Sequence, residues 1–188
     1  YAKSELNELR LTEGPSLESL ITDLSDEIAY SCHDIEDGLE MDYISVESLM
    51  QVSLWKEMYS QMQEKYKTAS LDILARSTIR GILNLLVTDL TTTTEENRKK
   101  YKIETAEDLK KVWANGVRIA GYSDEMFKQV RELKKYLLED LYHHERVIQM
   151  SKRGQSIIEK LFHYFLNHTE EIPEAYRKRM EEDGKYRA

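Results

Sequence analysis

The chain has 188 residues, with 35 acidic against 27 basic side chains, and its net charge of −8 disfavours nonspecific binding to nucleic acid or to an anionic membrane. Two prolines and seven glycines argue against a turn-rich β-sheet fold, and no apolar run approaches the roughly 20 residues that span a bilayer. A single cysteine, Cys32, excludes a disulfide scaffold, and without a signal-peptide pattern we expect a cytoplasmic protein.

The first predicted element is a helix over residues 15–39. Ser16 is the expected N-cap, and Gly38 can end the helix in a left-handed cap. Apolar side chains recur at helical spacing for about six turns and predict one buried face, which comprises Leu17, Leu20, Ile21, Leu24, Ile28, Cys32, Ile35 and Leu39.

The opposite face of this helix is acidic. At about 100° per residue, a narrow arc collects Asp23, Asp26, Tyr30, Asp34 and Asp37, with His33 at its edge. The helix has no lysine or arginine, so its carboxylates repel one another. A cation, or basic groups from elsewhere, would relieve this repulsion.

Further helices follow in chain order. Ser45 is the expected N-cap of a helix towards Tyr66, and residues 70–90 are apolar enough to predict a helix buried on most sides. The T-T-T-T-E-E-N-R-K-K-Y-K stretch after it predicts a loop or a frayed helix end. Later helices are expected to begin at Thr105 and Ser123, to cover 145–167, and to begin again at Pro173. The predicted fold is an all-α helical bundle.

A resemblance rests on residues 23–39, D-L-S-D-E-I-A-Y-S-C-H-D-I-E-D-G-L. They are similar to the helix that carries the last metal ligand in bacterial deoxyguanosine triphosphate triphosphohydrolases of the HD superfamily, whose form is D-x-A-D-E-I-A-Y-x-x-H-D-x-D-D-G-L. Ser25 and Glu36 depart mildly from that form. Weaker similarity continues at 133–147 and 157–165, so the resemblance covers most of the chain but is strong only near its start.

The resemblance implies roles for three residues. Asp26 would be a ligand of a divalent metal such as Mg or Mn, since a carboxylate suits a hard cation. Tyr30 and Asp34, about 6 and 12 Å further along the helix axis, would hold the deoxyribose. An exposed acidic face that packs on another subunit is the alternative interpretation.

The resemblance also implies where the chain lies in a longer enzyme. One histidine and a His-Asp pair of the family's metal site lie upstream of this helix, and nothing here matches them. We therefore expect residues 1–14 to be the tail of an upstream HD segment and residues 15–188 to be a single helical domain, the C-terminal part of the parent enzyme. Alone, this part would be inactive and would not retain the metal.

A triphosphate also needs cations. The candidates are Lys134, Lys135, Arg146, Lys152 and Arg153, together with Tyr142, His143 and His144. Arg146 and Lys152 are the preferred pair because they lie near the second family-like stretch. Helical spacing alone does not decide which of these side chains face a ligand.

Two functions remain open from the sequence. The first is part of a metal-dependent phosphohydrolase that cuts a deoxynucleoside triphosphate, preferably dGTP, to the nucleoside and triphosphate, and that forms homo-oligomers as the family does. The second is a non-catalytic helical regulatory or assembly module that binds nucleotides or other subunits. The residues do not reveal base preference, metal identity or the number of subunits.

Overall fold

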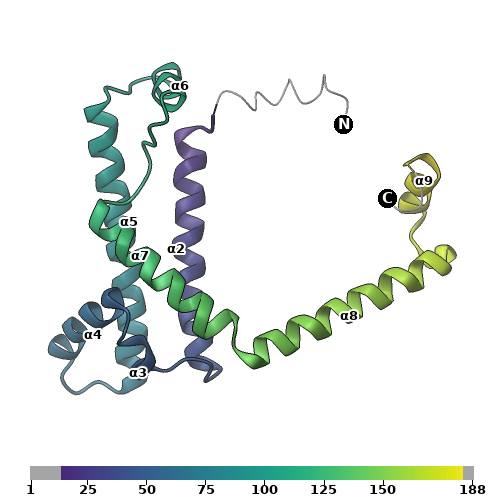
Figure 1. Cartoon of the computed structure of the whole chain (residues 1–188), viewed down its shortest axis with the longest axis horizontal. Coiled ribbons are helices and arrows are strands. Elements are labelled where there is room, and N and C mark those ends of the chain that lie inside the picture. Colours follow the sequence, from purple (N-terminus) through teal and green to yellow (C-terminus); the bar gives the residue numbers. More distant parts are fainter. Residues whose placement is uncertain (1–13, 184–188) are drawn as a thin grey trace. The chain divides into compact units, whose positions relative to one another are not determined.

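A computed structural model describes residues 14–183, in which every regular element is helical (Figure 1). The all-α class predicted from the sequence is therefore confirmed. The α-helices are α2 (Leu17–Glu40), α3 (Val46–Leu49), α4 (Ser53–Lys65), α5 (Leu71–Lys100), α6 (Ala106–Ala114), α7 (Asp124–Tyr136), α8 (Glu145–Asn167) and α9 (Glu174–Asp183). A π-helix, η1 (Leu137–Tyr142), continues α7, and a 3-10 turn, η2 (Thr169–Glu171), follows α8.

Contacts group the described residues into two compact units, 14–141 and 142–183. The single domain expected over residues 15–188 stays a prediction, and so does the upstream tail, of which residues 1–13 lie outside the described part. Among the described helices, none combines the length and the apolarity that crossing a membrane requires.

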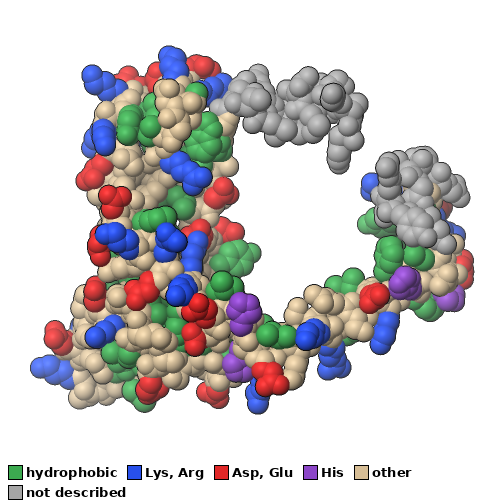
Figure 2. All heavy atoms as spheres, in the orientation of Figure 1, with side chains coloured by type: hydrophobic (Ala, Val, Ile, Leu, Met, Phe, Trp, Pro, Cys, Tyr) green, Lys and Arg blue, Asp and Glu red, His purple; other side chains and the backbone are tan. Residues whose placement is uncertain are grey.

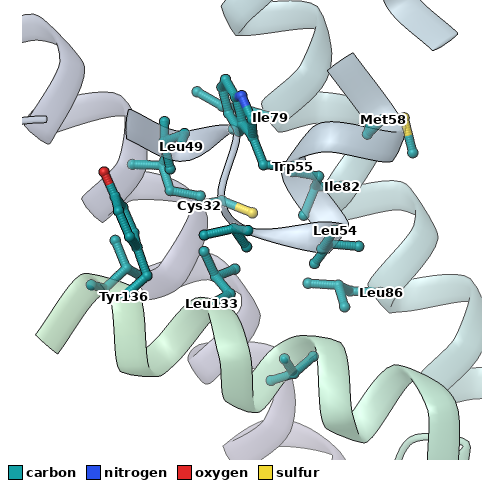
Figure 3. Packing of buried hydrophobic residues seen from close by; sticks show 14 of the residues in the cluster. Cys32, Leu49, Leu54, Trp55, Met58, Ile79, Ile82, Leu86, Leu133 and Tyr136 are labelled. Atoms are coloured by element: carbon teal, nitrogen blue, oxygen red, sulfur yellow. The ribbon is translucent and has the colours of Figure 1, made fainter. Parts of the chain in front are cut away.

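The first unit is built around one hydrophobic core. Helices α2 and α4 both pack against α5, and α7 packs against α4. Figure 3 shows side chains from all four helices meeting there, with the Cys32 sulfur directed into the cluster. Burial raises the pKa of the Cys32 thiol to about 11, so this cysteine is a protonated core residue.

The start of α2 agrees with the prediction from the sequence, but its end does not. Ser16 caps the helix by accepting a hydrogen bond from the Ser19 N–H at 3.2 Å. The helix continues past Gly38 to Glu40, and Asp42 takes the left-handed conformation instead, with φ 55°. The prediction of a cap at Gly38 is therefore wrong. A side chain at this glycine would meet Ile44, so close packing explains the residue.

Helix α5 is longer than its sequence predicts. It runs through the threonine-rich stretch to Lys100, so the predicted loop is wrong. Thr94 is buried, and the hydroxyls of Thr88 and Thr91 donate to carbonyls one turn earlier in the helix. Tertiary contacts thus keep a weakly helical segment in the helix. Gly81, within the same helix, lies against Met58 of α4, where a side chain would not fit.

The second unit consists of α8, η2 and α9. Helix α8 matches the predicted 145–167 segment, and α9 begins one residue after Pro173. The Tyr164 hydroxyl donates to Glu171 at 2.8 Å and ties η2 back to α8. Helix α8 itself buries no residue, and large apolar side chains along it are exposed.

Candidate functional site

The polar face of α2 carries the three residues that the sequence assigned to metal and sugar. Asp26 and Tyr30 are exposed, Tyr30 with 63% of its surface accessible, and Asp34 is half-buried. Because α2 is a continuous helix from Leu17 to Glu40, their four-residue spacing places the three side chains on one side of it, within an arc of about 80°. The structure therefore brings these residues together.

Asp26 is a free carboxylate as far as the described residues reach. Among the side chains that the structure describes, that of Asp26 has no partner in a hydrogen bond or an ion pair, and the same holds for the Tyr30 hydroxyl. A carboxylate that is exposed and unpaired on an all-acidic helix has the chemistry of a ligand for a hard divalent cation. By its exposure and its chemistry, the Asp26 carboxylate therefore fits the role of one metal ligand.

A complete metal site does not form within the described part of the chain. No group of three or more histidine, cysteine, aspartate or glutamate side chains is close enough there to hold a metal ion. The metal role of Asp26 therefore stays a prediction.

Lys134 is a cation that reaches this helix, as Arg76 of α5 does at Glu36. Its ammonium group, on α7, forms an ion pair with the Glu27 carboxylate, one residue after Asp26. The sequence included Lys134 among the possible phosphate contacts without preferring it. Lys134 is about 43% exposed and Glu27 about 34%, so the pair lies at the surface beside the polar face of α2. In the space-filling view, basic and acidic side chains alternate over the visible face of this unit (Figure 2).

Arg146 and Lys152 belong to the second unit. Both are exposed on α8, and six residues of helix separate their directions by about 120°. The structure therefore does not bring them together with each other. Their assignment to the substrate stays a prediction.

Two further residues near this face were not singled out from the sequence. The sequence did not distinguish Glu27 from the other acidic residues of the helix, because its partner Lys134 is more than a hundred residues away. Tyr122, between α6 and α7, has a buried hydroxyl without a hydrogen-bond partner among the described residues. Burial raises the pKa of its phenol, and the nearby carboxylates of Glu27 and Asp89 raise it further.

Comparison with known proteins decides the family resemblance. The chain is 47% identical over 178 residues to a deoxyguanosinetriphosphate triphosphohydrolase-like protein of Leptospira interrogans. The matched residues make up 95% of this chain and 47% of that protein. Proteins with the same description from Bordetella pertussis and Geobacter sulfurreducens are each 32% identical, over 90% and 92% of the chain. The chain is a relative of these proteins.

A family profile agrees with this similarity. The phosphohydrolase-associated domain matches residues 120–188, which contain α7, α8 and α9. The resemblance read from the α2 motif is therefore confirmed. The chain spans about half the length of the curated relatives it matches.

Proposed function

We propose that this chain is part of a metal-dependent triphosphohydrolase that converts dGTP to deoxyguanosine and triphosphate, and that α2 supplies the last metal ligand and part of the sugar pocket. One observation carries the proposal. Asp26, Tyr30 and Asp34 share one side of a helix whose sequence matches the family motif, in a chain similar to deoxyguanosinetriphosphate triphosphohydrolase-like proteins. The phosphohydrolase-associated domain supports a phosphohydrolase-related role.

Asp26 would hold the metal through its carboxylate oxygens. Repulsion among the α2 carboxylates favours a cation here, because no lysine or arginine of the helix itself offsets them. When bound, a divalent ion such as Mg²⁺ or Mn²⁺ supplies charge neutralisation at the phosphate. The remaining ligands would be the upstream histidine and His-Asp pair that the resemblance implies.

Tyr30 and Asp34 would orient the deoxyribose. Their positions, about 6 and 12 Å from Asp26 along the axis, suit a nucleotide that extends from the metal towards the C-terminal end of α2. A phenol can donate to the 3′-hydroxyl and a carboxylate can accept from it. Such contacts act by fixing the geometry of the reacting phosphate.

Lys134 would contact the triphosphate. It pairs with Glu27, the residue after Asp26, and an exposed ion pair of this kind is weak enough to open for a phosphate oxygen. We therefore propose Lys134 before Arg146 and Lys152 as a phosphate contact. We keep the latter two as proposed contacts.

Two properties of the parent protein belong to the same proposal. The exposed apolar side chains of α8, such as Ile158 and Phe162, favour self-association into a homo-oligomer. The free, buried thiol of Cys32 fits a reducing cytoplasm. The exposed face of α8 also favours the alternative function, a helical assembly module without catalysis.

The test compares three variants of the full-length protein by elemental analysis and by dGTP turnover. Asp26→Ala should lose metal and reduce turnover by orders of magnitude. Asp34→Asn should keep the metal and change the Michaelis constant or turnover through sugar orientation. Asp23→Asn, one turn earlier on the same acidic face, is the matched control and should keep both. Full metal in Asp26→Ala would contradict the assignment, and full activity in both Asp26→Ala and Asp34→Asn would favour the assembly module.

A further inference from the structure

The second unit contains an apolar pocket that the proposed function does not use. It has a volume of about 320 Å³ and lies where the last turns of α8 meet η2 and α9. Its wall is formed mainly by three aromatic rings and three aliphatic or thioether side chains, which are Phe162, Phe165, Tyr176, Leu166, Ile172 and Met180. Pockets of about 300–1,000 Å³ with apolar and aromatic walls are the usual binding sites of small molecules.

The three rings are not part of a packed core. Phe162, Phe165 and Tyr176 keep 51%, 39% and 54% of their surface exposed, and α8 buries no residue. Aromatic surface that stays in contact with water is unfavourable, and a ligand that enters the pocket covers it. The pocket therefore offers apolar area for binding.

One carboxylate sets the charge that the pocket accepts. Of the described side chains that line it, Glu171 alone is charged. The Tyr164 hydroxyl donates to this carboxylate at 2.8 Å, and the Tyr164 ring stacks on the His168 ring with centroids 4.2 Å apart. The acceptor is thus held in place before a ligand arrives, which lowers the entropic cost of binding.

This wall disfavours three classes of ligand. An anion is repelled by Glu171, and no lysine or arginine of the described lining offsets the repulsion. A bare metal ion needs several oxygen ligands, whereas the described wall offers one carboxylate. A neutral apolar molecule would cover the carboxylate without supplying a counter-charge. An organic cation avoids all three penalties, and the faces of the aromatic rings attract it as well.

We propose that this pocket binds a small organic cation, an alkylated ammonium group on an apolar body. The ammonium group lies beside the Glu171 carboxylate, and the apolar body lies against the aromatic rings. Cages of aromatic rings are known to recognise quaternary ammonium groups. Such binding requires neither the polar face of α2 nor a metal, so it is independent of the proposed function.

The test is a titration of the 188-residue chain with choline and with its uncharged isostere, in which carbon replaces nitrogen. The readout is the NMR signal of isotope-labelled methionine methyl groups, because Met180 lines the pocket and its signal is assigned with Met180→Leu. Choline should move this signal in a saturable manner. The isostere should bind about fivefold more weakly or worse, since it lacks the charge that Glu171 and the rings attract.

Three variants assign the effect to named side chains. Glu171→Gln keeps an acceptor for Tyr164 but removes the charge, so it should weaken choline binding about fivefold and leave the isostere unaffected. Tyr176→Leu keeps an apolar wall but removes a ring, and should weaken choline about two- to fivefold. Glu170→Gln is the matched control, because Glu170 is the exposed neighbour of Glu171 and does not line the pocket. It should bind choline as the native chain does.

Two results would overturn the proposal. Equal affinities for choline and its isostere would show that the pocket does not select a positive charge. A Met180 signal that moves when the protein is diluted, but not when choline is added, would show that a second copy of the chain fills the pocket. Metal content and dGTP turnover of the full-length protein test the proposed function separately, and neither depends on this titration.

Discussion

Asp89 of α5 accepts two hydrogen bonds from Ser123, one from the backbone N–H at 2.8 Å and one from the hydroxyl at 2.7 Å. Ser123 is also the N-cap of α7, where its hydroxyl accepts from the Met126 N–H at 3.3 Å. This contact fixes the residue at which α7 begins. It thereby fixes the position of Lys134, three turns further along the same helix.

The first prediction removes this contact. Asp89→Ala should lower the free energy of unfolding by about 1–3 kcal/mol, because the Ser123 N–H is left without its acceptor. Ser123→Ala should cost about 1 kcal/mol as a lost N-cap, and the double variant should cost less than the sum. Urea denaturation measures all three. Glu96→Gln, on the exposed side of α5, is the control and should stay within about 0.5 kcal/mol of the native chain.

The second prediction concerns the end of α2. A methyl group at Gly38 would lie 2.9 Å from two atoms of Ile44 and 3.1 Å from Leu141. Gly38→Ala should therefore destabilise the first unit by about 1–2 kcal/mol, since overpacking outweighs the helical gain from alanine. Gly154→Ala is the matched control, because a methyl group there meets nothing within 4 Å and should stabilise α8 by about 0.5–1 kcal/mol. Equal effects at both glycines would contradict the packing argument.

The third prediction concerns pH. Hydrogen bonds from the Arg98 guanidinium, at 2.7 and 3.0 Å, lower the pKa of Glu95 from 4.5 to about 2. A carboxyl whose pKa falls on folding stabilises the protein above its unfolded pKa and loses this contribution as pH falls towards the folded value. Between pH 4.5 and about 2, Glu95→Gln should thus lose less stability than the native chain. Urea midpoints across this range test it, and Glu96→Gln should follow the native profile.

Helix positions were predictable because their signals are local. Ser16, Ser45 and Ser123 each precede a helix and cap it in the structure, as their side chains suggested. The threonine-rich end of α5 was misread because threonine has a low helix propensity, whereas burial of Thr94 depends on contacts that no local pattern contains. Gly38 was misread for the same reason, since its neighbours Ile44 and Leu141 are reached only through the fold.

The candidate site was likewise predictable from the sequence only where its signals are local. Asp26, Tyr30 and Asp34 share a face because of the helical period, which the sequence alone reveals. The approach of Lys134 to Glu27 depends on how α7 crosses the first unit, and no spacing along the chain predicts it. The unsatisfied hydroxyl of Tyr122 likewise becomes visible only when its surroundings are known.

The fourth prediction concerns self-association through α8. Ile158 and Phe162 are 69% and 51% exposed on the apolar side of this helix. We expect the chain to self-associate, and Ile158→Glu with Phe162→Lys to shift it towards monomer in multi-angle light scattering. Ser156→Glu adds a charge at the centre of the opposite, polar side and serves as the control. A native chain that stays monomeric at high concentration counts against the prediction.

The fifth prediction concerns the 188-residue chain by itself. Asp26 is one carboxylate, and the described residues bring no set of three ligands together, so we expect weak binding of Mn²⁺ and no release of triphosphate from dGTP. Calorimetric titration with Mn²⁺ and chromatographic detection of triphosphate test the two parts. Asp26→Ala should change neither result in the isolated chain, whereas the same substitution in the full-length protein should remove metal and activity. Robust triphosphate release by the isolated chain would show that its own residues complete the metal site, and the assignment of ligands to an upstream segment would be wrong.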